Sequence, residues 1–411
     1  MSKILTILFF LLASCDLFGK TIIAGKGQVI GTLREAVSIA KDGDTILLHK
    51  GTYQEGNIII SRSIVLQGVG TPVLDGGSKY EILTLSGKDI VVRGIHFANA
   101  GYSSMNDFAA IKIIDASRVL IESNTITNAS FGIHFANSTH SIVRNNFIKG
   151  TNKSEHLSGN GIHLWKCSNM TIEGNEIHGH RDGIYFEFVT ESTIRKNISE
   201  KNVRYGLHFM FSHNDTYLDN TFRNNGAGVA VMYSKNVRME GNLFDQNWGP
   251  SSYGILLKDI SNSFISHNRF VQNTVAIHME GSSRIDIGKN IFKSNGWALK
   301  VQASCDDNTF HHNNFFGNSF DVATNGTMAL NRFSNNYWDK YDGYDMNKDG
   351  IGDVPYHPVS LYAMVVEQNP TTLMLMRSFM VSLLDKAEKA LPSLTPEHLA
   401  DNKPMLKPNK L

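Results

Sequence analysis

The sequence has little proline, little cysteine and little charge. Its 411 residues include nine prolines and three cysteines, and charged residues make up 19% of the chain. The formal net charge is +1, so no basic surplus argues for a nucleic-acid partner. Only Pro72 and Pro250 precede residue 355. Because proline removes a donor from a strand ladder, this scarcity favours strands over most of the chain.

The N-terminus holds only a short hydrophobic run. Ile4–Leu12 follows Lys3 and precedes small residues, which is typical of an export signal, and it is too short to span a bilayer. We therefore predict a signal peptide over residues 1–19. The segment Leu12-Ala-Ser-Cys15 resembles the lipobox of bacterial lipoproteins. Lipidation of Cys15 and ordinary cleavage near Lys20 stay open as alternatives, and either one takes the protein out of the cytoplasm.

A short phrase of alternating apolar residues recurs along the chain. Successive copies start 22 to 29 residues apart, at 132–135, 161–164, 183–186, 206–209, 228–231, 254–257, 276–279 and 298–301. The second and fourth residues of the phrase are apolar in every copy, as in a strand with one buried face. A period of this size is typical of a solenoid. The coil is too long for one strand and too short for a strand plus a helix. We therefore predict an all-β, right-handed parallel β-helix with about 22–23 residues per coil.

Asparagine recurs at a second fixed position of the repeat. Asn124, Asn145, Asn175, Asn220, Asn242, Asn268, Asn290 and Asn313 each stand two residues before an apolar residue. Asparagine tolerates the left-handed backbone conformation and suits a turn repeated in every coil. Stacked amides also bond one another, as in cross-β ladders. We therefore assign this column a structural role.

Both ends of the chain depart from the repeat. Within an N-terminal cap at 20–57, Gly31–Asp44 predicts a helix with Leu33, Ala36, Val37 and Ala40 on one face. The solenoid is predicted over 58–338, because seven of the nine prolines lie at or beyond residue 355.

The segment after the solenoid is predicted to be helical over 361–400, with one apolar helix over Thr371–Leu391. This helix caps the solenoid end or docks a partner, and one helix can do both. Partner contacts are predicted for Met374, Met376, Met380 and Leu383. The polar, proline-rich tail at 401–411 is predicted to be disordered.

Histidine and methionine gather at outward positions of the recurring strand. Met210 and Met232 are one coil step apart, about 4.8 Å in a parallel sheet, and His208 precedes Met210 by two residues. Thioether and imidazole ligands select Cu(I) over hard cations. His208, Met210 and Met232 are therefore candidate copper ligands, with His213 as a further candidate. The alternative is a stacked polar column without a ligand.

An acidic segment at 339–360 matches the start of a calcium loop. Asp345, Asn347, Asp349 and Asp353 occupy positions 1, 3, 5 and 9, with Gly350 at position 6 and the Ile351 carbonyl at position 7. Position 12 is Tyr356 and not glutamate, so Asp342 becomes the candidate for the missing ligand. We predict a structural Ca²⁺ here, and the alternative is an acidic turn without metal.

The two remaining cysteines lie far apart in the predicted solenoid. Cys167 and Cys305 are six coils apart, roughly 29 Å at the parallel strand spacing. A disulfide needs Cα atoms within about 7 Å. We predict two buried free thiols, although either is also a possible soft metal ligand.

The outward strand face lacks the acidic pairs of glycoside hydrolases. It holds the isolated Glu187 and Glu280, without the close carboxylate pair that hydrolysis requires. We therefore predict a non-enzymatic protein. A carbohydrate-active lyase or epimerase and a polysaccharide-binding module stay as alternatives.

Several short motifs carry a resemblance to a known family. They are Leu33-Arg-Glu-Ala-Val, Asp42-Gly-Asp-Thr-Ile, Lys50-Gly-Thr-Tyr, Asn336-Tyr-Trp-Asp339, Gly343-Tyr-Asp345, Asp349-Gly-Ile-Gly-Asp353-Val-Pro-Tyr356 and Pro358-Val-Ser-Leu. With these motifs the mature chain resembles the NosD family, exported maturation factors for nitrous oxide reductase. The resemblance implies a periplasmic partner of an ABC-type ATPase and permease. It also implies delivery of copper, with or without sulfur, to nitrous oxide reductase, with a copper chaperone lipoprotein as a further partner.

Overall fold

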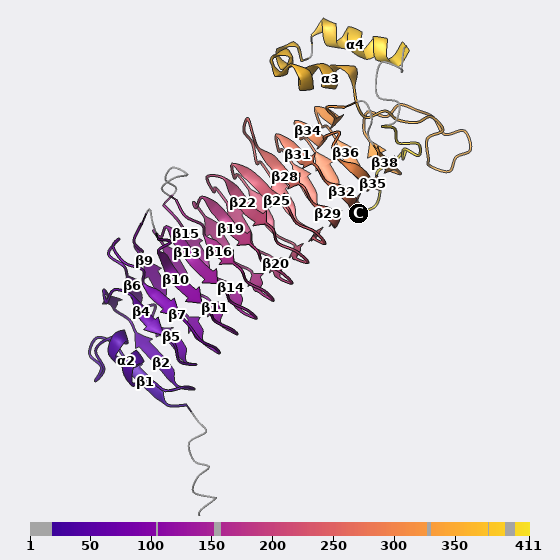
Figure 1. Ribbon diagram of the computed structural model, residues 1–411. Helices are drawn as coiled ribbons and strands as arrows, with labels where there is room; N and C mark the ends of the chain where they lie inside the picture. The colour runs from indigo at the N-terminus through magenta and orange to yellow at the C-terminus, as the bar shows by residue number, and fades with distance from the viewer. Residues whose placement is uncertain (1–18, 104–105, 152–157, 327–329, 377, 391–398) are drawn as a thin grey trace, which may run out of the picture.

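The structure is an elongated parallel β-helix (Figure 1). The computed structural model describes residues 19–103, 106–151, 158–326, 330–376, 378–390 and 399–411. Residues 1–18 of the predicted signal peptide, which include Cys15, lie outside the described residues. Strands stack in three parallel sheets along the whole length, which confirms the predicted all-β solenoid.

Each regular coil contributes one strand to each sheet. In the described residues sheet A has 14 strands: β1 (Thr21–Ala24), β2 (Thr45–His49), β5 (Val65–Val69), β8 (Val91–Arg93), β11 (Leu120–Glu122), β14 (Ile142–Arg144), β17 (Thr171–Glu173), β20 (Thr193–Arg195), β23 (Thr216–Leu218), β26 (Arg238–Glu240), β29 (Ser261–Ser266), β32 (Ser283–Gly288), β35 (Asp306–His311) and β38 (Leu330–Ser334). Sheet B has 13 in the same part of the chain: β3 (Thr52–Tyr53), β6 (Val73–Asp75), β9 (His96–Ala98), β12 (Thr125–Thr127), β15 (Phe147–Lys149), β18 (Glu176–His178), β21 (Ile198–Glu200), β24 (Thr221–Arg223), β27 (Leu243–Asp245), β30 (Arg269–Val271), β33 (Ile291–Lys293), β36 (Asn314–Phe316) and β39 (Tyr337–Trp338).

Sheet C is formed by the recurring phrase. Its 12 described strands are β4 (Ile58–Ile60), β7 (Leu83–Leu85), β10 (Ala109–Ile114), β13 (Phe131–Ala136), β16 (Ile162–Trp165), β19 (Asp182–Glu187), β22 (Tyr205–Met210), β25 (Ala227–Met232), β28 (Tyr253–Lys258), β31 (Val275–Glu280), β34 (Trp297–Val301) and β37 (Phe320–Ala323). Matching positions of the phrase pair in register, so that Ile184 lies beside Leu207 and Leu207 beside Val229. These apolar side chains have no exposed surface, which confirms that this parity faces the core.

A ladder of buried asparagines runs along the turn between sheets A and B. Asn220 is typical: its Oδ1 accepts from the backbone N–H and the Nδ2 of Asn197, both at 3.0 Å, and its Nδ2 donates to the Ile194 carbonyl at 2.9 Å. The ladder consists of Asn124, Asn146, Asn175, Asn197, Asn220, Asn242, Asn268, Asn290, Asn313 and Asn336. The predicted structural role of this column is therefore confirmed.

Two details of that prediction are wrong. The ladder residue of its coil is Asn146, whereas Asn145 is exposed with φ 55°. The left-handed conformation belongs to the residue before each ladder position, such as Lys196 or Asp219, and not to the ladder asparagine. A positive φ there turns the chain so that the following amide points inward, where it bonds its neighbours.

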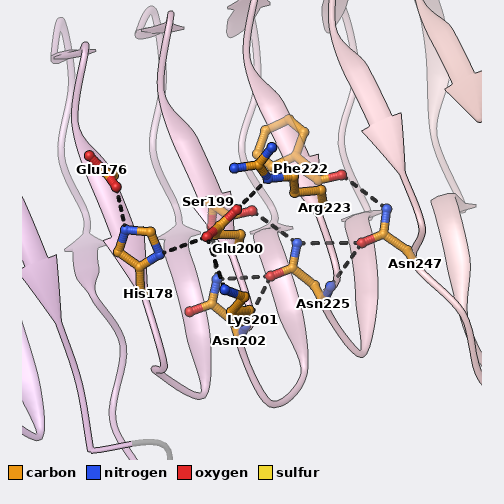
Figure 2. Close-up of polar contacts among 10 residues, drawn as sticks. All are labelled: Glu176, His178, Ser199, Glu200, Lys201, Asn202, Phe222, Arg223, Asn225 and Asn247. Carbon is orange, nitrogen blue, oxygen red and sulfur yellow. Dashed lines mark hydrogen bonds and ion pairs between the residues drawn. The ribbon is translucent and has the colours of Figure 1, made fainter.

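A second asparagine ladder follows the strands of sheet B and was not predicted (Figure 2). Asn202 donates to Asn225 Oδ1 at 2.9 Å, and Asn247 Nδ2 donates to the Phe222 carbonyl at 3.0 Å. The series continues through Asn273, Asn295 and Asn318. Two buried amide columns thus fix the register of the central and C-terminal coils.

The N-terminal end is covered by a helix, as predicted. Helix α2 (Leu33–Ile39) begins after Thr32, whose hydroxyl accepts from the Glu35 N–H at 3.2 Å. Leu33 and Ala36 are buried against the first coils, together with Ala40 beyond the helix. The helix is shorter than the predicted Gly31–Asp44, because Ala40 already has an extended backbone.

The predicted disorder of the tail at 401–411 is wrong. Phe333 and Tyr337 form parallel bridges with Asp401 and Met405, so the tail makes a partial last coil. Asp401 is fully buried, and its Oδ2 accepts from the backbone and side-chain nitrogens of Asn336, both at 3.0 Å, and from Trp338 Nε1 at 3.1 Å. A carboxylate offers acceptors only, so the asparagine ladder ends here without an unpaired donor.

The C-terminal segment forms two α-helices and not one. Helix α3 (Leu361–Gln368) is followed by the 3₁₀ turn η2 (Pro370–Leu375) and helix α4 (Phe379–Ala390). Pro370 cannot continue α3, which explains the break. Figure 1 shows α3 next to the last strands of sheet C and α4 on the outer side of α3, and Tyr362 and Val366 of α3 pack on Trp297 and Phe320. None of the helices in the described part of the chain is long and apolar enough to cross a membrane.

The buried tail carboxylate provides a first prediction. Replacing Asp401 with alanine leaves the Asn336 and Trp338 donors unpaired, and we expect the free energy of unfolding to fall by about 3 kcal/mol. Thermal and urea unfolding of the full chain measure this loss. The exposed neighbour Asn402 is the control, because its replacement by alanine leaves these bonds intact. Equal unfolding midpoints for the two variants would contradict a capping role for Asp401.

Candidate functional site

The outward face of sheet C brings three of the predicted copper-site residues together. His208 and Met210 alternate along β22 with Leu207 and Phe209, which point into the core. Met210 lies directly beside Met232 of β25, and His208 lies beside Ala230. His208, Met210 and Met232 therefore share one face over two adjacent coils, as the repeat predicted.

Aromatic and imidazole rings stack along this face. The ring centroids of His134 and His163 are 4.5 Å apart, those of His163 and Tyr185 4.7 Å, and those of Tyr185 and His208 5.0 Å. The stacked rings shield one another from solvent, so the exposed fractions of His134, His163 and His208 are only 8%, 9% and 5%. Burial lowers the pKa of His134 to about 4 and the pKa of His163 well below its ordinary value, so both imidazoles are neutral at pH 7.

His208 is held at one ring nitrogen and unpartnered at the other. Its Nδ1 lies 3.5 Å from Asp182 Oδ2 and 3.3 Å from Arg204 Nη2. Its Nε2 is buried and has no hydrogen-bond partner among the described residues. A carboxylate on one nitrogen with the other open is the arrangement by which proteins orient metal-binding histidines.

Asp182 anchors this arrangement from the first position of β19. It is fully buried, and Arg204 Nε donates to its Oδ1 at 2.9 Å. Burial raises the pKa of the Asp182 carboxyl, but the hydrogen bonds from Arg204 and His208 outweigh it and leave that pKa below its ordinary value. Arg204 was not singled out from the sequence as a partner of Asp182. Their spacing of 22 residues, one coil, was the available signal.

The thioether of Met210 is positioned by Tyr185. The Tyr185 hydroxyl lies 3.6 Å from Met210 Sδ and 3.3 Å from Glu187 Oε2. His213 lies beyond the strand, in the turn toward sheet A, and its Nδ1 accepts from the Lys235 N–H at 3.3 Å. One ring nitrogen of His213 is therefore already used, and its part in the proposed copper site stays a prediction.

The predicted calcium loop is organised by its own backbone. Asp345 Oδ2 accepts from the Gly350 N–H at 2.9 Å, Asp349 Oδ1 from Ile351 at 2.8 Å, and Asp353 Oδ2 from Met346 at 2.7 Å. Across the described ranges no group of three or more histidine, cysteine, aspartate or glutamate side chains is arranged to hold a metal ion. The structure therefore gives no support for calcium at Asp345, Asn347, Asp349, Ile351 and Asp353. A copper contact on sheet C would rely on thioethers.

Both described cysteines are buried and unpaired, as predicted. Burial raises the pKa of Cys167 to about 11, so its thiol stays protonated and does not suit a metal ligand. The predicted partner contacts lie on the C-terminal helical segment, where Met374 is 90% exposed. Met376, Met380 and Leu383 are also exposed, and their role in docking stays a prediction.

A separate polar cluster lies on sheet B (Figure 2). His178 Nε2 is 2.8 Å from Glu176 Oε1, and its Nδ1 is 3.3 Å from Glu200 Oε1. Arg223 Nε bonds Glu200 from the next coil. Because the two ring nitrogens face different carboxylates, the cluster is an ion-pair network between coils and not a convergent metal site.

Solved structures with a similar fold include polysaccharide-processing enzymes. The catalytic unit of the GH87 α-1,3-glucanase from Streptomyces thermodiastaticus matches with a TM-score of 0.60 at 11% identity, over 74% of this chain and 65% of that chain. The periplasmic alginate epimerase AlgG matches with a TM-score of 0.50 at 12% identity, over 71% of this chain and 76% of that chain. At these identities the similarity shows the fold alone.

Sequence comparisons identify closer relatives. A "Probable ABC transporter binding protein NosD" of Pseudomonas aeruginosa is 29% identical over 403 residues, 91% of each chain. A protein of the same name from Stutzerimonas stutzeri is 28% identical over 382 residues, covering 88% of this chain and 86% of its own. The family model described as "Periplasmic copper-binding protein (NosD)" matches residues 150–347, which include β19, β22 and β25. The chain is therefore similar to NosD proteins along most of its length, and to the NosD family model over residues 150–347.

Proposed function

We propose that this protein is a periplasmic copper-handling protein that works with an ABC-type ATPase and permease in the maturation of nitrous oxide reductase. The family description and the names of the two relatives support copper binding and a transporter partner. A copper chaperone lipoprotein supplies the ion in this proposal, and nitrous oxide reductase receives it. Copper is thus cargo and not a resident cofactor.

The observation that carries the proposal is the environment of His208. Asp182 and Arg204 lie against Nδ1 of the imidazole, while the buried Nε2 has no partner among the described residues. Met210 and Met232 add two thioethers on the same face, one strand apart. Imidazole and thioether donors favour Cu(I), which suits transient binding and release.

Docking to the permease is assigned to the C-terminal helical segment. Met374, Met376, Met380 and Leu383 are exposed there, together with Phe379 at 83%. Exposed apolar side chains gathered on one segment mark interaction surfaces. The inner side of the same segment packs on sheet C, so the surface has a firm base.

The copper contact can be tested by removing both thioethers. Replacing Met210 and Met232 with alanine should weaken Cu(I) binding at least tenfold, because a soft cation loses two soft ligands. Competition with a chromophoric Cu(I) chelator under reducing conditions measures the dissociation constant. Met346→Ala is the control, since Met346 is 78% exposed in the acidic loop, away from sheet C. An unchanged affinity in the double variant would show that Cu(I) binds elsewhere.

The carbohydrate-active alternatives receive no specific support. They rest on a fold shared at 11–12% identity with enzymes that act on polysaccharides. Release of unsaturated sugars from uronate polymers by the purified protein would favour them over the copper-handling proposal.

A further inference from the structure

Three exposed aromatic rings stack in the turn that follows sheet C. They belong to Phe188, Phe211 and Tyr233, which come directly after the last residues of β19, β22 and β25. Their ring centroids are 5.3 and 5.0 Å apart, with interplanar angles of 10° and 14°. The exposed fractions are 44%, 37% and 39%, so the rings form a continuous apolar strip on the surface.

The backbone at these positions does not favour aromatic residues. All three have a positive φ, between 49° and 55°, a conformation that is costly for bulky side chains. The same turn in other coils carries Asp115, Asn137, Lys166, Asp259 and Gly281, also with positive φ. The fold therefore accepts small or polar residues here, and the three aromatics need another explanation.

Ring orientation narrows the choice of ligand. Phe211 has a neighbouring ring against both faces, so the strip presents ring edges to the outside. Sugars stack on exposed aromatic faces, which this arrangement largely removes. Ring edges carry the positive rim of the aromatic quadrupole and attract thioether sulfur, often about 5 Å from the ring.

The strip is continuous with the proposed copper contact. Met210 and Met232 directly precede Phe211 and Tyr233, and the Phe211 N–H donates to the Met232 carbonyl at 3.2 Å. Exposed side chains of opposite charge, Lys166 and Asp259, lie in the same turn one coil beyond each end of the strip. A bound segment would therefore contact ring edges that attract thioether sulfur along the middle of the strip. Its two ends would lie near side chains of opposite charge, Lys166 and Asp259.

We propose that Phe188, Phe211 and Tyr233 form a docking strip for a methionine-bearing segment of the protein that exchanges Cu(I) with Met210 and Met232. The inference rests on the proposed copper-handling function and specifies how a partner is recognised there. The partner's methionines lie along the ring edges, close enough to the two thioethers of this chain to pass the ion between them.

The test replaces the three aromatic residues with asparagine, the residue that occupies the same turn position at Asn137. Asparagine tolerates a positive φ, so the melting temperature of the variant Phe188→Asn, Phe211→Asn, Tyr233→Asn should stay unchanged or rise. A fluorescent synthetic peptide with two methionines in Met-X-X-Met spacing, with and without Cu(I), serves as the probe. Fluorescence anisotropy should show at least tenfold weaker peptide binding in the variant, whereas Cu(I) affinity by chelator competition should change less than twofold.

A matched control removes an exposed aromatic elsewhere. Phe264 of sheet A is 57% exposed, and Phe264→Ser should leave peptide binding unchanged. Equal peptide affinity in the triple variant and the native protein would overturn the docking strip, as would a native protein that does not bind the peptide. Binding of a uronate oligosaccharide that is lost in the triple variant would also overturn it.

The same experiment separates this inference from the proposed function. If the native protein binds the copper-free peptide in an aromatic-dependent way but does not bind Cu(I), the docking strip stands and the copper-handling function fails. If Cu(I) binds with the expected dependence on Met210 and Met232 but the triple variant binds peptide normally, only the docking strip fails.

Discussion

Replacing Asn220 with alanine should lower the free energy of unfolding by about 4 kcal/mol, a large part of the stability of a typical domain. The Asn220 amide makes four hydrogen bonds, all buried. It accepts two from Asn197 and donates to the Ile194 carbonyl and to Asn242 Oδ1. Alanine leaves the Asn197 N–H and the Ile194 carbonyl without these partners in a place that water does not reach, and each costs about 1–3 kcal/mol.

The measurement should account for the repeat architecture. Solenoids need not unfold in one step, so urea midpoints should be combined with hydrogen exchange of the coils that contain Asn197 and Asn242. Asn224→Gly is the control, because Asn224 lies in the same coil, is exposed and has φ 52°, which glycine adopts freely. If the two variants lost similar stability, the buried amide column would not hold the coils together.

Replacing Asp215 with asparagine should stabilise the protein at pH 8 and remove a pH dependence. Asp215 Oδ1 accepts from the Ser192 N–H at 2.8 Å, but its buried Oδ2 has no hydrogen-bond partner among the described residues. The equivalent position in the preceding coil is Ser192, whose hydroxyl makes the same bond to Met170. Burial raises the pKa of Asp215 to about 8, so the folded protein keeps this carboxyl protonated at neutral pH.

The sign of the effect follows from proton binding. Between pH 4 and 8 the unfolded chain has an ionised Asp215 and the folded chain a protonated one, so stability falls as the pH rises through this range. The loss reaches up to about 5 kcal/mol at pH 8 and above, since each unit of pKa difference is worth about 1.4 kcal/mol. Asparagine is neutral and keeps an acceptor for Ser192, so the variant should not show this loss.

Melting temperatures of native protein and variant between pH 4 and 9 check the prediction. The two should differ little near pH 4 and diverge as the pH rises, with Asp215→Asn the more stable. Asp219→Asn is the control, because Asp219 is an exposed carboxyl in the same coil. Parallel melting curves for native protein and Asp215→Asn would show that this carboxyl ionises normally in the folded state.

The repeat made the fold and one face of the site predictable. Apolar parity and a constant period determine which residues stack, and they place His208, Met210 and Met232 together. The burial of His208 was not predictable, because it depends on rings from neighbouring coils and on the flanking Tyr205, whose centroid is 4.9 Å away. Asp182 and Arg204 lie at or before the first residue of their strands, outside the repeated phrase from which the site was predicted.

The two main errors share a physical cause. Composition predicted disorder for the tail, but one buried carboxylate and the four β-bridges of Asp401 and Met405 are enough to hold it on the last coil. Local spacing selected Asn145 over Asn146, although the preceding left-handed residue determines which amide turns inward. In both cases a single position in a stacked column decides the structure, and an average over a window of sequence does not resolve it.

The contact between Asn336 and Asp401 also imposes an order on chain assembly. Sixty-five residues separate the two partners. The coils up to β39 can therefore stack before Asp401 has docked on them. Until the tail docks, the aromatic end formed by Phe333 and Trp338 is open to the strand edges of another incompletely folded chain. End-to-end joining of molecules whose tail has not docked is thus the misassembly that we expect of this architecture, and slow docking of the tail is the condition that promotes it.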